Sequence, residues 1–142
     1  MTLPASQILH ASCVTVGDRG LLILGPSGSG KSALAIKLMT MGAALVADDR
    51  TELSVEAGHL VARCPAAIRG LIEARGLGLL RAETVEASRI ALVADLGQTE
   101  GHRLPPHRKI TILGCEVNLV LHPQNDHFPQ GLMLYLSHGR QA

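Results

Sequence analysis

One segment has the residue types and spacing of a loop that binds the phosphates of a nucleoside triphosphate: Gly25-Pro26-Ser27-Gly28-Ser29-Gly30-Lys31-Ser32. Glycines let successive backbone N–H groups turn toward anionic oxygens. Lys31 is spaced to reach the β- and γ-phosphates, and the Ser32 hydroxyl to ligate Mg²⁺. An apolar stretch, 21–24, precedes the loop and good helix formers, 33–39, follow it. A flexible Gly/Ser turn with a stray lysine is therefore the weaker interpretation.

Two adjacent carboxylates follow the next apolar stretch, 43–47. If this stretch is a strand parallel to 21–24, its carboxyl end lies at the same edge of the sheet as the loop. Asp48 and Asp49 then stand near the bound phosphates. One carboxylate could serve the metal, and the other could take a proton from an incoming hydroxyl. The apolar run before them predicts burial, which favours this interpretation over an ordinary solvated strand end.

Three other side chains are ambiguous on pattern alone. His10 lies within an expected strand, 8–16, where a histidine is more often a satisfied core or edge residue than a functional one. Arg69 and Arg75 flank a glycine-rich block. They could face phosphate or an acidic partner surface, or they could form ordinary salt bridges.

Composition restricts the partners that we expect. The chain has 142 residues, of which 46% are hydrophobic and 18% charged, as in a compact globular protein. The net charge of +1 provides no electrostatic basis for binding nucleic acid or an anionic membrane. One Phe, one Tyr and no Trp leave few platforms on which single-stranded bases could stack.

Cysteine spacing and hydropathy bear on where in the cell the protein resides. The three cysteines are far apart and form no Cys-x-x-Cys pair, so neither a disulfide framework nor a zinc site is predicted. No apolar run approaches the length of a membrane span, and the first residues do not resemble a signal peptide. We therefore expect a cytoplasmic protein.

The hydrophobic pattern predicts an α/β fold, a mixed β-sheet around the phosphate loop, with residues 1–142 forming a single domain. The block 68–78 is rich in glycine and is left unassigned. The other expected elements are a hairpin of 8–16 and 21–24, a helix at 33–39, a strand at 43–47, a hairpin of 51–55 and 60–63, a strand at 89–96, a polar loop at 97–108, strands at 110–113 and 117–121, and a short helix at 132–136.

Two large branches of phosphate-loop proteins are not indicated. A GTPase would need an Asn-Lys-x-Asp segment to read its base, and a transporter ATPase would need Leu-Ser-Gly-Gly-Gln; the sequence contains neither.

Five blocks together resemble one family, the HPr kinase/phosphorylase of bacteria. The resemblance is to its C-terminal catalytic domain, which has a PEP carboxykinase-like fold, and to the truncated form found in alphaproteobacteria. The blocks are Leu9-His10, the phosphate loop, Leu45-Val46-Ala47-Asp48-Asp49-Arg50, Glu73-Ala74-Arg75-Gly76-Leu77-Gly78, and Arg103-Leu104.

The resemblance implies an activity and a set of partners. The family transfers the γ-phosphoryl group of ATP, with Mg²⁺, to a serine of the phosphocarrier HPr, or of its nitrogen-phosphotransferase counterpart. It also removes that phosphate by attack of inorganic phosphate. In this way it regulates the phosphotransferase system and carbon metabolism. The longer members are hexamers, so a homo-oligomer is expected.

The resemblance also implies residue roles. Lys31 would bind the transferring phosphates, and Asp49 would accept the proton of the serine hydroxyl and return it in the reverse reaction. The metal would be held by Ser32 and Glu73, with Asp48 also acting at it. His10 and Arg103 would line the reacting phosphates.

Some positions depart from the family pattern. Ala33 stands where the family often has Glu, and the segment before His10 leaves no room for the N-terminal regulatory domain of longer members. The tail is short and unlike the family's C-terminal stretch. Kinase activity is therefore the firmer expectation, ahead of the reverse reaction. The alternatives are a nucleotide-binding regulator of the same fold without transfer, and a phosphate-loop kinase of another substrate.

Overall fold

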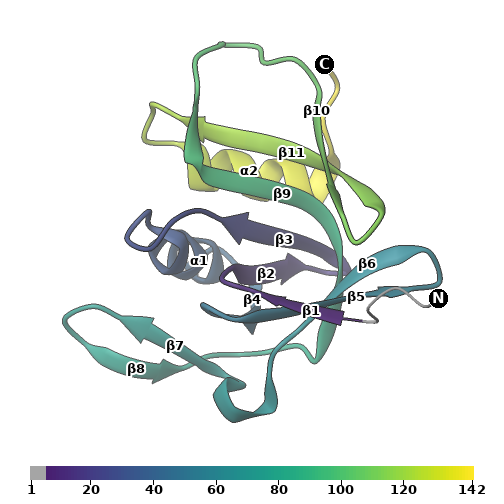
Figure 1. Ribbon diagram of the computed structural model, residues 1–142. Coiled ribbons are helices and arrows are strands. Elements are labelled where there is room, and N and C mark those ends of the chain that lie inside the picture. Colours follow the sequence, from purple (N-terminus) through teal and green to yellow (C-terminus); the bar gives the residue numbers. More distant parts are fainter. Residues whose placement is uncertain (1–5) are drawn as a thin grey trace.

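The computed structural model describes residues 6–142; residues 1–5 of the predicted domain lie outside the described residues. Figure 1 shows the arrangement of the elements. In chain order they are β1 (Ser6–Leu9), β2 (Ser12–Val16), β3 (Arg19–Leu24), α1 (Lys31–Thr40), β4 (Ala44–Ala47), β5 (Thr51–Glu56), β6 (His59–Arg63), the 3₁₀ turn η1 (Ala66–Ile68), β7 (Leu71–Ala74), β8 (Gly78–Arg81), β9 (Ala87–Glu100), β10 (Arg108–Ile112), β11 (Cys115–Pro123) and α2 (Phe128–His138).

The main sheet is mixed, which confirms the predicted α/β class. Its path over the described residues is β1-β5-β6-β9-β3-β2-β4, with β11 beside β9 and β10 beside β11. Strands β3 and β11 both run parallel to β9. Strand β2 is antiparallel to β3 and to β4, so β3 and β4 point the same way. The carboxyl ends of β3, β4, β9 and β11 therefore lie at the same edge of the sheet.

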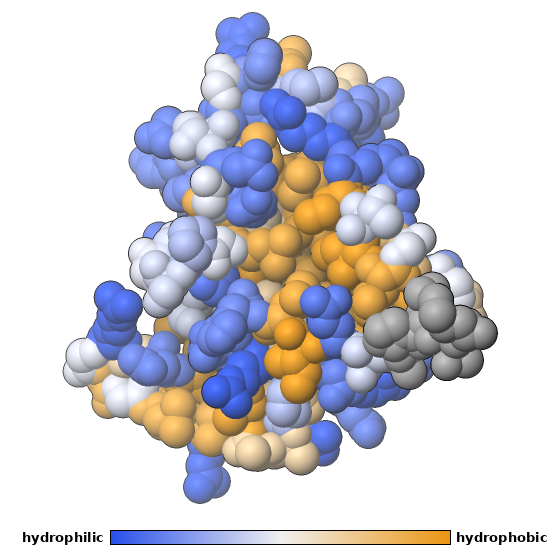
Figure 2. All heavy atoms as spheres, viewed as in Figure 1, coloured by the Kyte–Doolittle hydropathy of each residue, from blue (hydrophilic) through white to orange (hydrophobic). Residues whose placement is uncertain are grey.

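The two helices cover one face of this sheet. Leu34 and Leu38 of α1 and Leu132 and Leu136 of α2 are buried in one core cluster, together with Leu21 and other inward residues of the strands. Neighbouring strand residues point to the opposite face, as the period of two in a strand requires. There a second cluster forms around Leu22, Val46, Leu53 and Val93. Figure 2 shows apolar residues gathered in the middle of this second face.

The predicted continuous strand over 8–16 is wrong, because the chain bends at His10 between β1 and β2. The reason is that the two halves pair with different strands: β1 with β5, and β2 with β3 and β4. Ala11, at the bend, donates its N–H to the carbonyl of Asp49 at 3.2 Å. Its own carbonyl accepts the Thr51 hydroxyl at 2.8 Å. The bend is thus tied directly to the segment that carries the aspartates.

Most other expected elements are confirmed with longer bounds. The unassigned block 68–78 contains β7 and the first residue of β8, which form a separate two-stranded sheet. The predicted polar loop 97–108 begins later than expected, since β9 continues to Glu100. The helix predicted at 132–136 extends over Phe128–His138. Among residues 6–142, no helix has the length and apolar character needed to cross a membrane.

Gly20 should be required for the close pairing of β3 with β9. A Cβ atom at this position would lie 2.6 Å from the Arg89 carbonyl oxygen and 2.8 Å from the Ser88 hydroxyl. We expect Gly20→Ala to lower the free energy of unfolding by about 1–3 kcal/mol, measured by urea titration, because the strands must move apart. Gly101→Ala is the control: it meets no atom within 4 Å and should change stability by less than about 0.5 kcal/mol. Equal stability of the two variants would contradict the prediction.

Candidate active site

The loop between β3 and α1 depends on glycine for its shape. Gly25 and Gly30 have φ angles of 151° and 99°, in the region that L side chains rarely adopt. A Cβ at Gly25 would also lie 2.4 Å from the Ser29 hydroxyl oxygen. The Ser29 hydroxyl is itself buried, with no hydrogen-bond partner among the described residues. The loop is therefore a tight turn that only glycine at its ends permits.

The start of α1 is well suited to an anion. Gly30, at the N-cap, provides no side-chain hydrogen bond, and the first turn carries no acidic residue. The first N–H groups of a helix have no partner within it and lie at the positive end of its dipole. They remain available to phosphate oxygens at this position.

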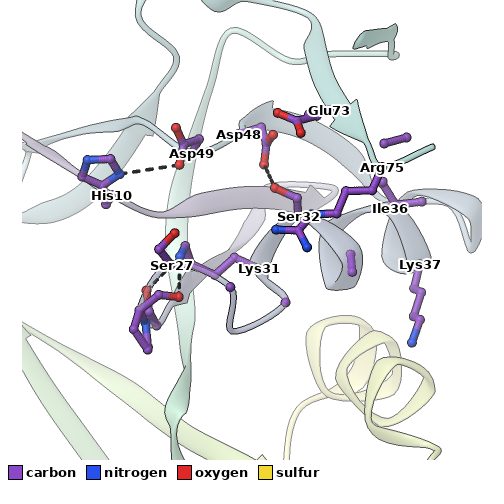
Figure 3. Close-up of a pocket in the computed structure, with 16 residues that line it drawn as sticks. His10, Ser27, Lys31, Ser32, Ile36, Lys37, Asp48, Asp49, Glu73 and Arg75 are labelled. Atoms are coloured by element: carbon purple, nitrogen blue, oxygen red, sulfur yellow. Dashed lines mark hydrogen bonds and ion pairs between the residues drawn. The ribbon is translucent and has the colours of Figure 1, made fainter. Parts of the chain in front are cut away.

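Lys31 lies inside the loop and not in solvent. Its side chain folds back so that Nζ donates to the carbonyls of Gly25 and Pro26, at 2.8 and 3.1 Å (Figure 3). An ammonium group has three donors, so one N–H remains free. These contacts hold a positive charge against the loop before any phosphate arrives.

Asp48 connects the loop helix to the sheet. It follows β4 and is only 8% exposed. Its Oδ1 accepts the hydroxyl of Ser12, on β2, at 2.8 Å and the hydroxyl of Ser32, on α1, at 2.7 Å. The sequence analysis did not identify Ser12 as a functional residue. The one sequence feature that could have indicated it is a small hydroxyl residue within an apolar strand. It is fully buried and satisfies a buried carboxylate that would otherwise be costly.

Asp49 points away from this cluster. Its φ of 66° places it in the left-handed region, so the chain turns sharply after Asp48. The Asp49 side chain is 65% exposed, and its Oδ1 lies 3.5 Å from Nδ1 of His10, which is 79% exposed (Figure 3). The adjacent carboxylates therefore occupy different environments, one packed against Ser32 and one open to solvent beside an imidazole.

A single cavity of about 970 Å³ joins these groups. It is lined by the phosphate loop, His10 and both aspartates, and by Glu73 and Arg75, which come from β7 and the turn after it. Arg75 makes no ion pair among the described residues, which favours the interpretation that it faces a ligand. The structure thus brings together most of the side chains that the sequence analysis selected. Ser29, whose hydroxyl is buried within the loop, and Arg69, which is exposed and makes no ion pair among the described residues, do not line the cavity.

Arg103 also lies outside the cavity. It is exposed in the segment between β9 and β10 and does not line the cavity. Strand β9 carries this segment on the order of 10 Å beyond the level of the loop. Glu100, at the start of this segment, accepts two hydrogen bonds from the Arg108 guanidinium, each at 3.1 Å. The guanidinium, together with His102, lowers the pKa of Glu100 to about 2. The expectation that Arg103 lines the reacting phosphates is therefore not met in this single chain.

The oxygens near the loop suit a hard cation. Ser32 and Asp48 offer a hydroxyl and a carboxylate, which are ligands that Mg²⁺ accepts. Within residues 6–142, no three His, Cys, Asp or Glu side chains gather closely enough to hold a metal by themselves. Glu73 lines the cavity without joining such a group. This fits Mg²⁺, which takes one or two carboxylates and leaves its other positions to water and substrate phosphates.

Loss of Asp48 should destabilise the fold, whereas loss of its neighbour should not. Asp48→Ala leaves the buried Ser12 hydroxyl without its acceptor. We expect the free energy of unfolding to fall by about 1–3 kcal/mol in urea titration. Asp49→Asn is the control because the Asp49 side chain is exposed and Asn tolerates the left-handed φ at this position, so it should change stability by less than about 0.5 kcal/mol. A similar loss in both variants would show that the Ser12–Asp48–Ser32 contact has no special role.

Comparison with known proteins agrees with this geometry. The family described as "HPr Serine kinase C-terminal domain" matches residues 1–100. Over 123 residues the chain is 41% identical to the HPr kinase/phosphorylase of Aromatoleum aromaticum, covering 77% of this chain and 39% of that protein. It is 39% identical over 127 residues to the HPr kinase/phosphorylase of Caldicellulosiruptor bescii, covering 80% of this chain and 41% of that protein. The chain thus spans about two fifths of the length of these relatives.

A solved structure shares this fold over most of the chain. The Hpr(Ser) kinase/phosphatase from Coxiella burnetii superimposes with a TM-score of 0.76 at 27% sequence identity. The similarity covers 92% of this chain and 93% of that one.

Proposed function

The chain belongs to the HPr serine kinase C-terminal domain family, and we propose that residues 1–142 act as one catalytic domain that transfers the γ-phosphoryl group of ATP to a serine of an HPr-like phosphocarrier. The observation that carries this proposal is the separation of the two carboxylates. Asp48 is packed against the loop serine, while Asp49 stays open at the mouth of the same cavity. A kinase needs both environments: one for the nucleotide and one for the incoming hydroxyl.

The phosphates would be held by groups already in place. Phosphoryl transfer depends mainly on positioning and on neutralising charge. The N–H groups at the start of α1 would face the phosphate oxygens, and Lys31 would add a fixed positive charge through its free N–H. Because the glycines preset the loop, little reorganisation is required when the nucleotide binds.

Mg²⁺ would be held by Ser32 and Asp48, with Glu73, which lines the same cavity, acting on its water shell. When bound, the metal would neutralise charge on the β- and γ-phosphates.

Asp49 would act as the general base. A serine hydroxyl is a weak nucleophile until its proton is removed, and a carboxylate in contact with it can accept that proton. Asp49 is exposed at the cavity mouth, where a serine on another protein can reach it. His10, at 3.5 Å, would orient the carboxylate. The same carboxyl could return the proton in the reverse reaction with inorganic phosphate.

A second candidate is a nucleotide-binding regulator without transfer activity. It is favoured by the position of Arg103, which lies outside the cavity although the resemblance places an arginine at the reacting phosphates. The homo-oligomer, the reverse reaction and the cytoplasmic location stay predictions.

Lys31→Met should abolish tight triphosphate binding. The ammonium is the cation held within the loop, and charge-assisted hydrogen bonds contribute about 1.5–3 kcal/mol each. We expect the affinity for Mg-ATP to fall at least about tenfold in calorimetric titration. Lys109→Met, on β10 and outside the cavity, removes the same charge and should bind as before. An equal loss in both variants would show that only overall charge matters.

Asp49→Asn should abolish transfer while leaving nucleotide binding intact. The test is incubation of the protein with γ-labelled ATP and the HPr-like protein of the same organism. We expect label on a serine with the unmodified protein and a rate about 10²–10⁴-fold lower with Asp49→Asn, the range of general acid–base catalysis. Transfer that survives in Asp49→Asn would show that Asp49 is not the base. ATP binding without any transfer by the unmodified protein would favour the regulator.

A further inference from the structure

A second, smaller hollow lies beside the phosphate loop. It has a volume of about 190 Å³ and lies between α1, the end of β9 and the turn from β11 into α2. Its walls include Leu34, Leu96, His122 and Phe128. Lys37 lines both this hollow and the large cavity, so the two adjoin along α1. The residues from β11 and α2 lie beyond the stretch 1–100 that matches the family.

We propose that this hollow, at the ends of β9 and β11, receives the purine base of the nucleoside triphosphate. The inference rests on the proposed function, because it presupposes that the loop binds the triphosphate.

The sheet topology places the hollow beside the phosphates. Leu24, the last residue before the loop, pairs with Asp95 of β9, and Asp95 pairs with Leu121 of β11. Leu96 and His122 are the next residues along these two strands. In open α/β sheets, ligands bind beyond the carboxyl ends of the strands. A nucleotide at the loop therefore reaches the hollow without leaving this edge of the sheet.

The position of the metal ligands sets the direction of the nucleotide. In the order β11-β9-β3-β2-β4, Asp48 follows β4, on one side of the loop strand β3. The transferring phosphate and its metal must lie toward Asp48 and Ser32. The rest of the nucleotide then extends to the other side of β3, where β9 and β11 end.

An irregularity in β9 opens the hollow. The pairing register with β11 shifts after Leu121, so that His122 pairs with Thr99. The Asp95 carboxylate holds the extra residues in place by accepting the N–H of Gly97 at 2.8 Å and the side-chain amide of Gln98 at 2.7 Å. Bulges of this kind commonly redirect side chains next to binding sites. Here the extra residues include Leu96, which lines the hollow.

The residues that line the hollow have side chains suited to binding a purine ring. The His122 and Phe128 rings lie with centroids 5.5 Å apart and tilted by 36°. Phe128 is the only phenylalanine of the chain, and it is only half-buried. Asn125, also in the lining, uses its Oδ1 to accept the His127 N–H, which leaves its NH₂ group to donate to a ring nitrogen. The exposed carboxylate of Asp126 can accept from an exocyclic amine.

The test compares ATP with inorganic tripolyphosphate, which has the phosphates but no base. We expect Phe128→Leu to weaken ATP binding about tenfold, the scale of one base–aromatic stack, and to leave tripolyphosphate affinity unchanged. Leu134→Ala is the matched control on α2, because Leu134 is exposed and lies outside the hollow. It should bind both ligands as the unmodified protein does. Unchanged ATP affinity in Phe128→Leu would overturn the proposal.

Photolabelling with 8-azido-ATP gives a second readout that does not depend on how well the variant folds. Label on the peptide that contains residues 122–129 supports the proposal. Label near Ile36 or Arg75, which line the large cavity but not the hollow, overturns it and leaves phosphate binding intact. If the unmodified protein binds tripolyphosphate as tightly as ATP, the proposal that the hollow binds the purine base is also wrong. If it binds neither ligand, the proposed function fails as well.

Discussion

The Asp48 carboxylate is the contact on which the site depends. One oxygen accepts the hydroxyls of Ser12 and Ser32 and so joins β2, the end of β4 and the first turn of α1. A carboxylate with so little exposure needs such partners, since an unsatisfied buried charge is strongly unfavourable. The position of the phosphate loop relative to the sheet is therefore tied to the group that we propose to hold the metal. If Asp48 holds the metal as proposed, folding and metal binding share one interaction.

The two aspartates occupy different environments because of one backbone angle. Left-handed geometry at Asp49 turns its side chain away from the buried pair, and the bend at Ala11 holds that turn through backbone hydrogen bonds. His10 lies on the same bend, so the imidazole and the exposed carboxylate meet because the chain leaves β1 there. The left-handed turn thus leaves one carboxylate open to solvent, next to one that is buried against the loop serine.

Strand β9 organises the rest of the binding edge. It pairs with β6 near its start and with β3 and β11 farther on, so it is the neighbour of the strand that carries the loop. Its bulge after Asp95 places Leu96 against the loop, while its continuation to Glu100 carries Arg103 away. The same strand therefore provides a wall of the proposed base pocket and carries away an arginine that the sequence resemblance would place at the phosphates.

The sequence alone was sufficient for features encoded in neighbouring residues. The glycines and lysine of the loop, the helix after it and the aspartates after an apolar strand are local patterns, and the structure has them where they were predicted. Tertiary structure decided what depends on distant partners. The strand 8–16 breaks because its halves pair with different strands, and Ser12 matters only once β4 brings Asp48 beside it. The hollow unites Leu34, Leu96 and Phe128, whose association no local pattern encodes, because it arises from the pairing of β9 with β3 and β11.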